Sequence, residues 1–192
     1  MSSLSYSSEY SCHNFPTQVA SMPNSLYHSL QGQYYVGYAD NMFFDQDKNA
    51  WAALSNPIHS CVNLFVNIWT VTDLFPPPIR IQIWLNATLP GTPTPSTIVT
   101  PANTTIYPPT TPKVQILQAS NVSDTPVGGA MAFVRRTVPG ETVVAEEEGK
   151  FIIPPGGNFA VFLSNTEGEN ITANTRVAFG WWEEPIYCCN EY

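Results

Sequence analysis

Four cysteines have the clearest capacity for chemistry in this 192-residue sequence: Cys12, Cys61, Cys188 and Cys189. Adjacent Cα atoms lie about 3.8 Å apart, below the roughly 4.4–6.8 Å that disulfides span, so a bond between Cys188 and Cys189 would be strained. Successive side chains of an extended chain point to opposite sides, which allows these two thiols to meet different partners. We therefore interpret all four cysteines as candidates for disulfides between subunits, with four reduced thiols as the alternative.

Tryptophan and glutamate side chains in the second half of the chain indicate a different chemistry, the binding of sugars. Trp84, Trp181 and Trp182 are candidate exposed aromatic binding residues. Trp181 and Trp182 are adjacent on a predicted strand, so they face opposite sides, and we expect one or both to be buried. Glu183 and Glu184 diverge in the same way, which makes them a poor pair of catalytic carboxylates.

Motifs for metal binding and catalysis are missing from the sequence. The histidines have no partner at metal-ligand spacing, and the cysteines include no Cys-x-x-Cys pair; the three histidines are His13, His28 and His59. The nucleophile elbow, the phosphate-binding loop and the dinucleotide fingerprint do not occur. We expect no enzymatic activity, no cofactor and no metal ion.

Asp45, Asp47 and Asn49 alternate as in the first half of a calcium-binding loop. Ala50 occupies the sixth position, where such loops need glycine, and no glutamate stands at the twelfth. A solvated turn therefore explains this cluster better than a calcium site.

The composition excludes several classes of partner. Charged residues make up 11% of the chain, and its net charge of −8 reflects only seven Lys and Arg residues, which argues against nucleic acid and anionic membranes as partners. No apolar stretch approaches the ~20 residues of a membrane span, so we expect no membrane insertion. The N-terminal residues lack the basic and apolar regions of a secretory signal.

The apolar pattern has a period of two through most of the chain, which predicts strands. Ile79, Ile81 and Ile83 alternate with polar residues. In residues 61–72 the same pattern assigns Ile68 to the face of Val66 and Trp69 to the opposite face. We further predict one helix at 47–54, a long Pro/Thr-rich loop at 89–112 with a brief strand at Ile98 and Val99, and an acidic hairpin turn at 145–150.

These segments predict an all-β chain: a jelly-roll-like antiparallel β-sandwich of about 8–10 strands, with an immunoglobulin-like sandwich as the alternative. We assign residues 1–30 to an N-terminal arm, 31–185 to the sandwich and 186–192 to a cysteine-containing C-terminal tail.

Four segments resemble an uncharacterised domain family of spore-forming bacteria: SLYHSLQGQYYVGYADN, AWAALSNPIHSCVNLFVNIWTVTD, IIPPGGNFAVFLSN and VAFGWWEEP. The chain is also similar, more weakly, to the endospore appendage pilins, through its Ser/Tyr-rich arm with Cys12, its predicted strands and its low charge. The second resemblance implies jelly-roll subunits that stack into fibres through an N-terminal connector with cysteines. Those pilins carry adjacent cysteines on the connector, whereas this chain has Cys188 and Cys189 at its C-terminus, so their bonding pattern does not transfer.

We therefore expect a self-assembling structural subunit of an extracellular or spore-surface fibre, in which arm or tail binds a neighbouring copy and disulfides lock the contact. Its partners are identical subunits, and its assembly inside a cell that later lyses would need no secretory signal. The alternative is a non-catalytic module that binds a surface glycan or another surface.

Overall fold

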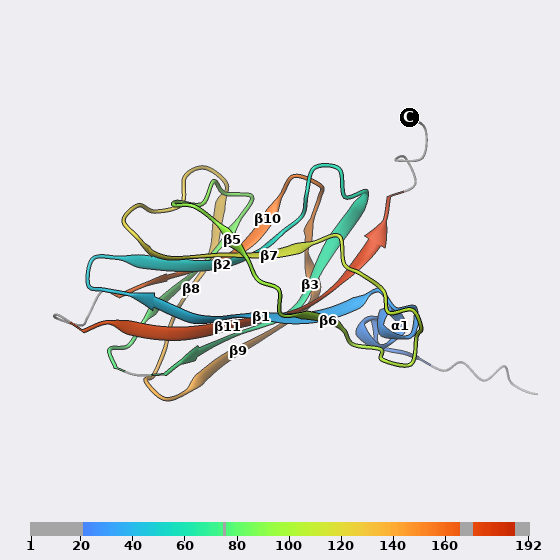
Figure 1. Ribbon diagram of the computed structural model, residues 1–192, viewed down its shortest axis with the longest axis horizontal. Coiled ribbons are helices and arrows are strands. Elements are labelled where there is room, and N and C mark those ends of the chain that lie inside the picture. The colour runs from blue at the N-terminus through green and yellow to red at the C-terminus, as the bar shows by residue number, and fades with distance from the viewer. Residues whose placement is uncertain (1–20, 75, 166–170, 187–192) are drawn as a thin grey trace, which may run out of the picture.

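The structure is a computed structural model that describes residues 21–74, 76–165 and 171–186. Within these ranges the chain forms one short helix and eleven strands (Figure 1). The elements are α1 (Asn24–Leu30), β1 (Tyr34–Phe44), β2 (Asn49–Ser55), β3 (Val62–Asp73), β4 (Arg80–Leu85), β5 (Thr94–Pro95), β6 (Val99–Pro101), β7 (Gln115–Val122), β8 (Ala130–Arg136), β9 (Thr142–Ile153), β10 (Asn158–Ser164) and β11 (Ala173–Pro185).

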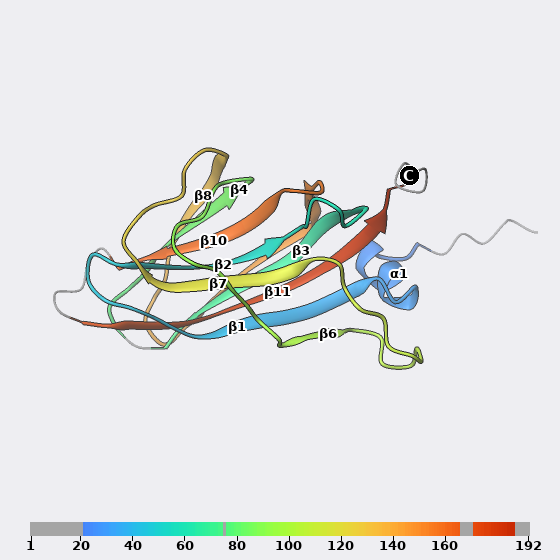
Figure 2. The same ribbon diagram turned by 45° about the horizontal axis from the view of Figure 1, so that its top comes forward.

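Two antiparallel sheets pack face to face, which confirms the all-β sandwich (Figures 1 and 2). Sheet A has the order β6-β1-β11-β3-β9, and sheet B has the order β5-β7-β2-β10-β4-β8. The first four strands pair in reverse order with the last four: β1 with β11, β2 with β10, β3 with β9 and β4 with β8. This nested pairing is the winding of a jelly roll. The three remaining strands, β5–β7, belong to an insertion between β4 and β8.

The main core lies between the sheets and is built from alternate residues of each strand. Ile79, Ile81 and Ile83 are fully buried, as their spacing predicted. Trp69 and Trp181 are fully buried in the same cluster. Burying side chains of this size stabilises a fold by roughly 1.5–3 kcal/mol each, so these layers dominate its stability.

The predicted position of the helix was wrong. Residues 49–55 form β2, in which five consecutive side chains are buried. The prediction failed because both faces of β2 are covered, and a strand buried on both faces loses the alternation that distinguishes it from a helix.

The helix that does form, α1, lies within the segment assigned to the arm and begins directly after Pro23. It has seven residues, and the described part of the chain contains no helix with the length and apolar character to cross a bilayer.

The insertion covers part of the outer face of sheet B. Its first segment packs Leu89 over a second, smaller cluster that contains Trp51 and Phe162. The Trp51 indole N–H donates to the carbonyl of Pro90 at 2.7 Å. The Pro/Thr-rich run is mostly loop with two very short strands, β5 and β6, as its prolines predicted.

The predicted acidic turn at 145–150 was also wrong, because β9 continues through it as one strand of 12 residues. The pairing of β9 with β3 shifts between Val66 and Ile68, and Glu148 and Gly149 have positive φ angles in this irregular region. A β-bulge therefore replaces the turn. Strand β3 has a bulge of its own against β11, where Gly180 and Trp181 pair with Ile68 and Val66 and leave Asn67 as an extra residue. This bulge reverses the expected faces of β3: Trp69 enters the core, while Ile68 is half-buried outside it.

Candidate functional site

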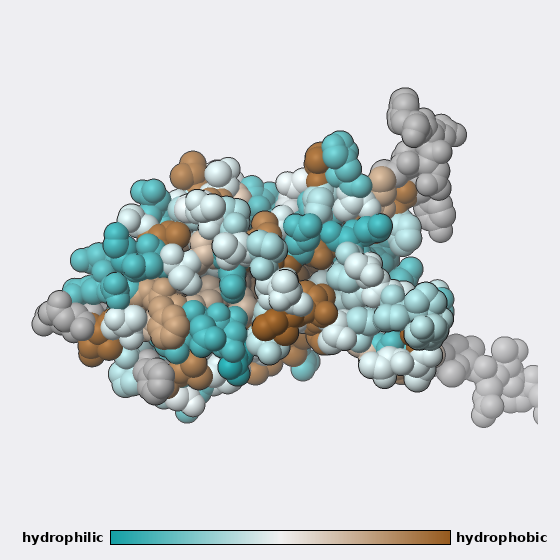
Figure 3. Space-filling view, in the orientation of Figure 1, coloured by the Kyte–Doolittle hydropathy of each residue, from teal (hydrophilic) through white to brown (hydrophobic). Residues whose placement is uncertain are grey.

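An apolar groove on the outer face of sheet A is the most distinctive surface feature of the described chain. We call it the outer groove; its volume is about 540 Å³. Its lining consists of Val36, Gly37, Tyr38, Ile68, Thr70, Thr97, Ile98, Val99, Thr100, Ala178 and Phe179. None of these residues carries a charge. A hydrophobic patch is visible near the centre of the space-filling view, in the region that β6 occupies in Figure 1 (Figure 3).

Small residues create the outer groove. Ala178 on β11 contributes little side-chain volume to its lining, while Val36 and Ile98 remain 38% and 43% exposed at its sides. A Cβ atom on Gly37 would lie 2.6 Å from the carbonyl oxygen of Ile98, which is too close for any side chain. Glycine at this position therefore permits the insertion to approach β1 and form one wall of the groove.

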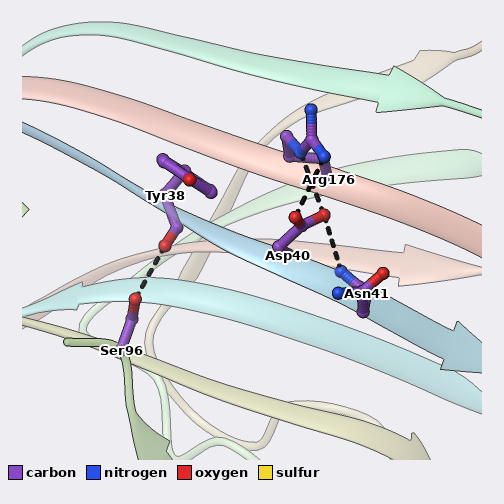
Figure 4. Close-up of polar contacts among 5 residues, drawn as sticks. All are labelled: Tyr38, Asp40, Asn41, Ser96 and Arg176. Carbon is purple, nitrogen blue, oxygen red and sulfur yellow. Dashed lines mark hydrogen bonds and ion pairs between the residues drawn. The ribbon is translucent and has the colours of Figure 1, made fainter. Parts of the chain in front are cut away.

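Polar contacts hold β1 to the insertion and to β11 next to the outer groove (Figure 4). The Ser96 hydroxyl donates to the carbonyl of Tyr38 at 2.7 Å. The Arg176 guanidinium donates two hydrogen bonds of 2.9 Å to the Asp40 carboxylate and lies over the Tyr38 ring. These hydrogen bonds from Arg176 lower the pKa of Asp40. The fork-like pairing fixes the position of Tyr38, so this end of the groove is preformed.

At the other end of sheet A, helix α1 packs on the outer face through a stack of three aromatic rings. Trp182 lies between His28 and Phe65, with ring centroids 5.1 and 5.3 Å away and nearly parallel planes. His28 also contacts the Glu184 carboxylate at 3.2 Å and the Gln33 amide oxygen at 3.0 Å. These contacts anchor the chain immediately after residues 1–20.

A second cavity lies beside the start of α1 and borders the outer groove. Its lining includes Met22 and Asn24 at the start of the helix, Glu146 and Glu148 on β9, and Ile68, which also lines the outer groove. Met22, at the start of the described chain, therefore lines a cavity that shares one residue with the outer groove.

Glu183 lies on the inner face of β11 and clamps the insertion to sheet A. Its carboxylate accepts hydrogen bonds from the backbone N–H groups of Lys113 and Val114 and from the Trp181 indole at 2.9–3.1 Å. Burial raises the pKa of Glu183, and these three donors oppose the rise. Glu184 faces the opposite side toward His28, so the two carboxylates do not form a catalytic pair.

Strand β8 forms an edge of sheet B, and its backbone pairs on one side only among the described residues. Most of its side chains are exposed, including Met131 at 47% and Val134 at 42%. Edge strands of this kind are templates for pairing with another chain.

Three of the four cysteine candidates lie outside the described residues: Cys12, Cys188 and Cys189. Cys61 directly precedes β3; it is half-buried and has a free thiol. The described residues contain no group of three side chains arranged to hold a metal ion. Asp45 accepts a hydrogen bond from Thr172, and Asn49 donates to the Asp124 carbonyl, so the two point to different partners.

Trp181 and Trp182 are 0% and 2% exposed, which agrees with the expectation that one or both are buried and removes them as exposed binding residues. Trp181 lies in the main core, and α1 covers Trp182. Trp84 is half-buried, packs against the second cluster and donates its indole N–H to Gln82. These positions provide no concave aromatic platform for a sugar.

The outer groove was not predicted from the sequence. Its residues come from β1, β3, β11 and the insertion, segments that are far apart in the chain. The only local signal was the pair Ile98 and Val99, two aliphatic residues within a Pro/Thr-rich loop. The role of His28 was missed because its two partners on β11, Trp182 and Glu184, lie about 150 residues away in the chain.

A sequence model described as a family of unknown function, DUF6143, matches residues 10–188 of this chain. No curated protein and no solved structure shows significant similarity to this chain.

Proposed function

We propose that this chain, which belongs to the DUF6143 family, is a structural subunit that assembles with copies of itself into an extracellular or spore-surface fibre. The observation that carries the proposal is the uncovered outer groove. The insertion covers part of the outer face of sheet B, and α1 covers one end of sheet A, but about 540 Å³ of uncharged groove stays open. Apolar surface that a single chain leaves open is typical of a binding site for a partner.

We propose residues 1–20 of a neighbouring copy as the occupant. This segment contains Leu4, Tyr6 and Tyr10 at even positions, separated mainly by serines. Twenty extended residues reach up to about 66–72 Å, which is long enough to bridge two subunits. The segment has one acid, Glu9, and no lysine or arginine, which suits an uncharged groove.

Such a contact joins the arm of one subunit to the groove of the next. Because the two surfaces differ, the contact is head-to-tail, and it produces an open filament unless the rotation between subunits closes a ring. The exposed edge of β8 offers a second contact by strand addition along the same filament. Disulfides through Cys12 and the tail would then prevent dissociation.

The resemblance to endospore appendage pilins supports the finer part of the proposal, a location on the spore surface. It implies assembly inside a cell that later lyses. No catalytic step is needed for this function, and we propose none. The glycan-binding alternative is disfavoured because two of its three tryptophans are buried.

Deleting residues 1–20 is expected to abolish fibre formation while leaving the sandwich folded, because the deletion removes the connector and ends before α1. Fibre mass is measured by sedimentation, and folding by the thermal unfolding midpoint. A matched control replaces residues 1–20 with a Gly/Ser segment of equal length, which is also expected to prevent assembly. Fibres of normal length from either variant would show that the arm is not the connector.

A further inference from the structure

Helix α1 is attached to sheet A through a single buried side chain, and that side chain is titratable. His28 is the only residue of α1 that is buried, and its ring stacks on Trp182 of β11. Leu26, Tyr27 and Leu30 on the same helix are about half exposed. Surface helices are ordinarily attached by a buried apolar stripe. The attachment of α1 depends instead on the state of one imidazole ring.

Both nitrogen atoms of the His28 ring face oxygen atoms. Nδ1 lies 3.0 Å from the amide oxygen of Gln33, and Nε2 lies 3.2 Å from a carboxylate oxygen of Glu184. The same Glu184 oxygen accepts a hydrogen bond from the Trp182 indole, which fixes its position. A neutral imidazole has one N–H group, whereas the imidazolium has two. Only the charged ring can therefore donate to both oxygen atoms.

The charges around His28 also favour the imidazolium. Glu184 is in direct contact with the ring, and Glu146 and Glu148 line the cavity beside the start of α1. The insertion contacts α1 through Asn103, which is uncharged. The charged residues on the neighbouring elements near α1 are Glu146, Glu147, Glu148 and Lys150 on β9, Glu183 and Glu184 on β11, and Lys113 before β7. Carboxylates outnumber lysines in this set, so the surroundings are negative.

We propose that His28 is a pH-dependent anchor: the protonated ring fixes α1 to sheet A, and loss of the proton releases the helix. Histidine ordinarily changes its charge between about pH 5 and 8. Because the charged ring makes more contacts in the attached state, attachment is strongest at acid pH and weakens as the pH rises. In the fibre the arm would leave the sandwich from α1, so its position would depend on pH; this consequence alone rests on the proposed function.

Hydrogen exchange of backbone amides, followed by NMR, tests the anchor in the full-length chain below the concentration at which fibres sediment. The probes are the amides of Gln31 and Gln33, which donate to the carbonyls of Tyr27 and His28. Their protection is compared at about pH 5.5 and about pH 8, on either side of the usual histidine titration, after correction for the intrinsic exchange rate. The amides of β10 serve as the internal reference for global unfolding.

Protection of the two probes is expected to fall at least about tenfold from the lower to the higher pH, while protection of β10 changes less. His59→Gln, which removes an exposed histidine, is the matched control and is expected to behave like wild type. His28→Gln is expected to show no fall, and Glu184→Gln a smaller one.

The wild type alone keeps the test decisive if a variant does not fold, because the His28 ring resonance is expected to titrate with the same midpoint as the loss of protection. The proposal is overturned by unchanged protection in wild type, by a fall equal to that of β10, by different midpoints, by a fall that persists in His28→Gln, or by a fall of full size in Glu184→Gln. All of these outcomes concern α1 within one chain, so they are independent of whether fibres form.

Discussion

Replacing Val36 and Ile98 together by aspartate is expected to raise the protein concentration needed for fibre assembly at least about 100-fold. Both side chains are exposed in the single chain and line the outer groove. Docking of the arm would bury both side chains. Each aspartate therefore removes a hydrophobic contribution to the binding of the arm and places a charge in the buried contact. Sedimentation across a concentration series measures the effect.

A matched control separates loss of the groove from a general effect of added charge. Ile58 and Val138 are also exposed, at 64% and 53%, but they do not line the outer groove. The Ile58→Asp/Val138→Asp variant adds the same charge, and we expect it to assemble like wild type. If both double variants assemble normally, the groove is not the docking surface; if both fail, the effect reflects charge alone.

Replacing Glu183 by alanine is expected to destabilise the sandwich by about 3 kcal/mol or more, because three N–H donors lose their acceptor. The insertion loses its attachment at Lys113 and Val114. Thermal and denaturant unfolding measure the loss. Glu184→Ala, which removes the adjacent carboxylate on the outer face, is the matched control and is expected to cost less; equal effects would show that the clamp contributes little.

The same residue predicts a pH dependence. Burial raises the pKa of Glu183 in the folded chain above its unfolded value, so the folded state binds this proton more tightly. The contribution of Glu183 to stability is therefore greatest below the unfolded pKa and decreases as the pH rises through the folded pKa. Glu183→Gln is expected to remove this decrease from the pH profile of unfolding; an unchanged profile would contradict the assignment.

Much of the fold could be predicted because alternating apolar and polar residues indicate a strand that is covered on one face only. Ile79, Ile81 and Ile83 show this pattern, and their burial confirms it. The prediction failed at β2, which is buried on both faces. It also failed at Ile68 and Trp69, where a bulge in β3 shifts its pairing register with β11. A bulge reverses the two faces of a strand, and alternation alone cannot place it.

The candidate site was much less predictable than the fold. The outer groove depends on Gly37 and Ala178, small residues that carry no chemical signature. The anchor of α1 depends on the stack of His28 and Trp182, which only the pairing of β1 with β11 brings together. Cysteine chemistry was recognisable from composition, but the contact of Cys61 with Ile186 at the end of β11 follows only from the register of β3 with β11.

The central claim is that this chain assembles with itself, and electron microscopy of the purified full-length protein tests it most directly. The sample is prepared at neutral pH without reductant, over a range of protein concentrations. We predict unbranched filaments of uniform width that become more abundant as the concentration rises. A field of isolated single chains at every concentration would contradict the account.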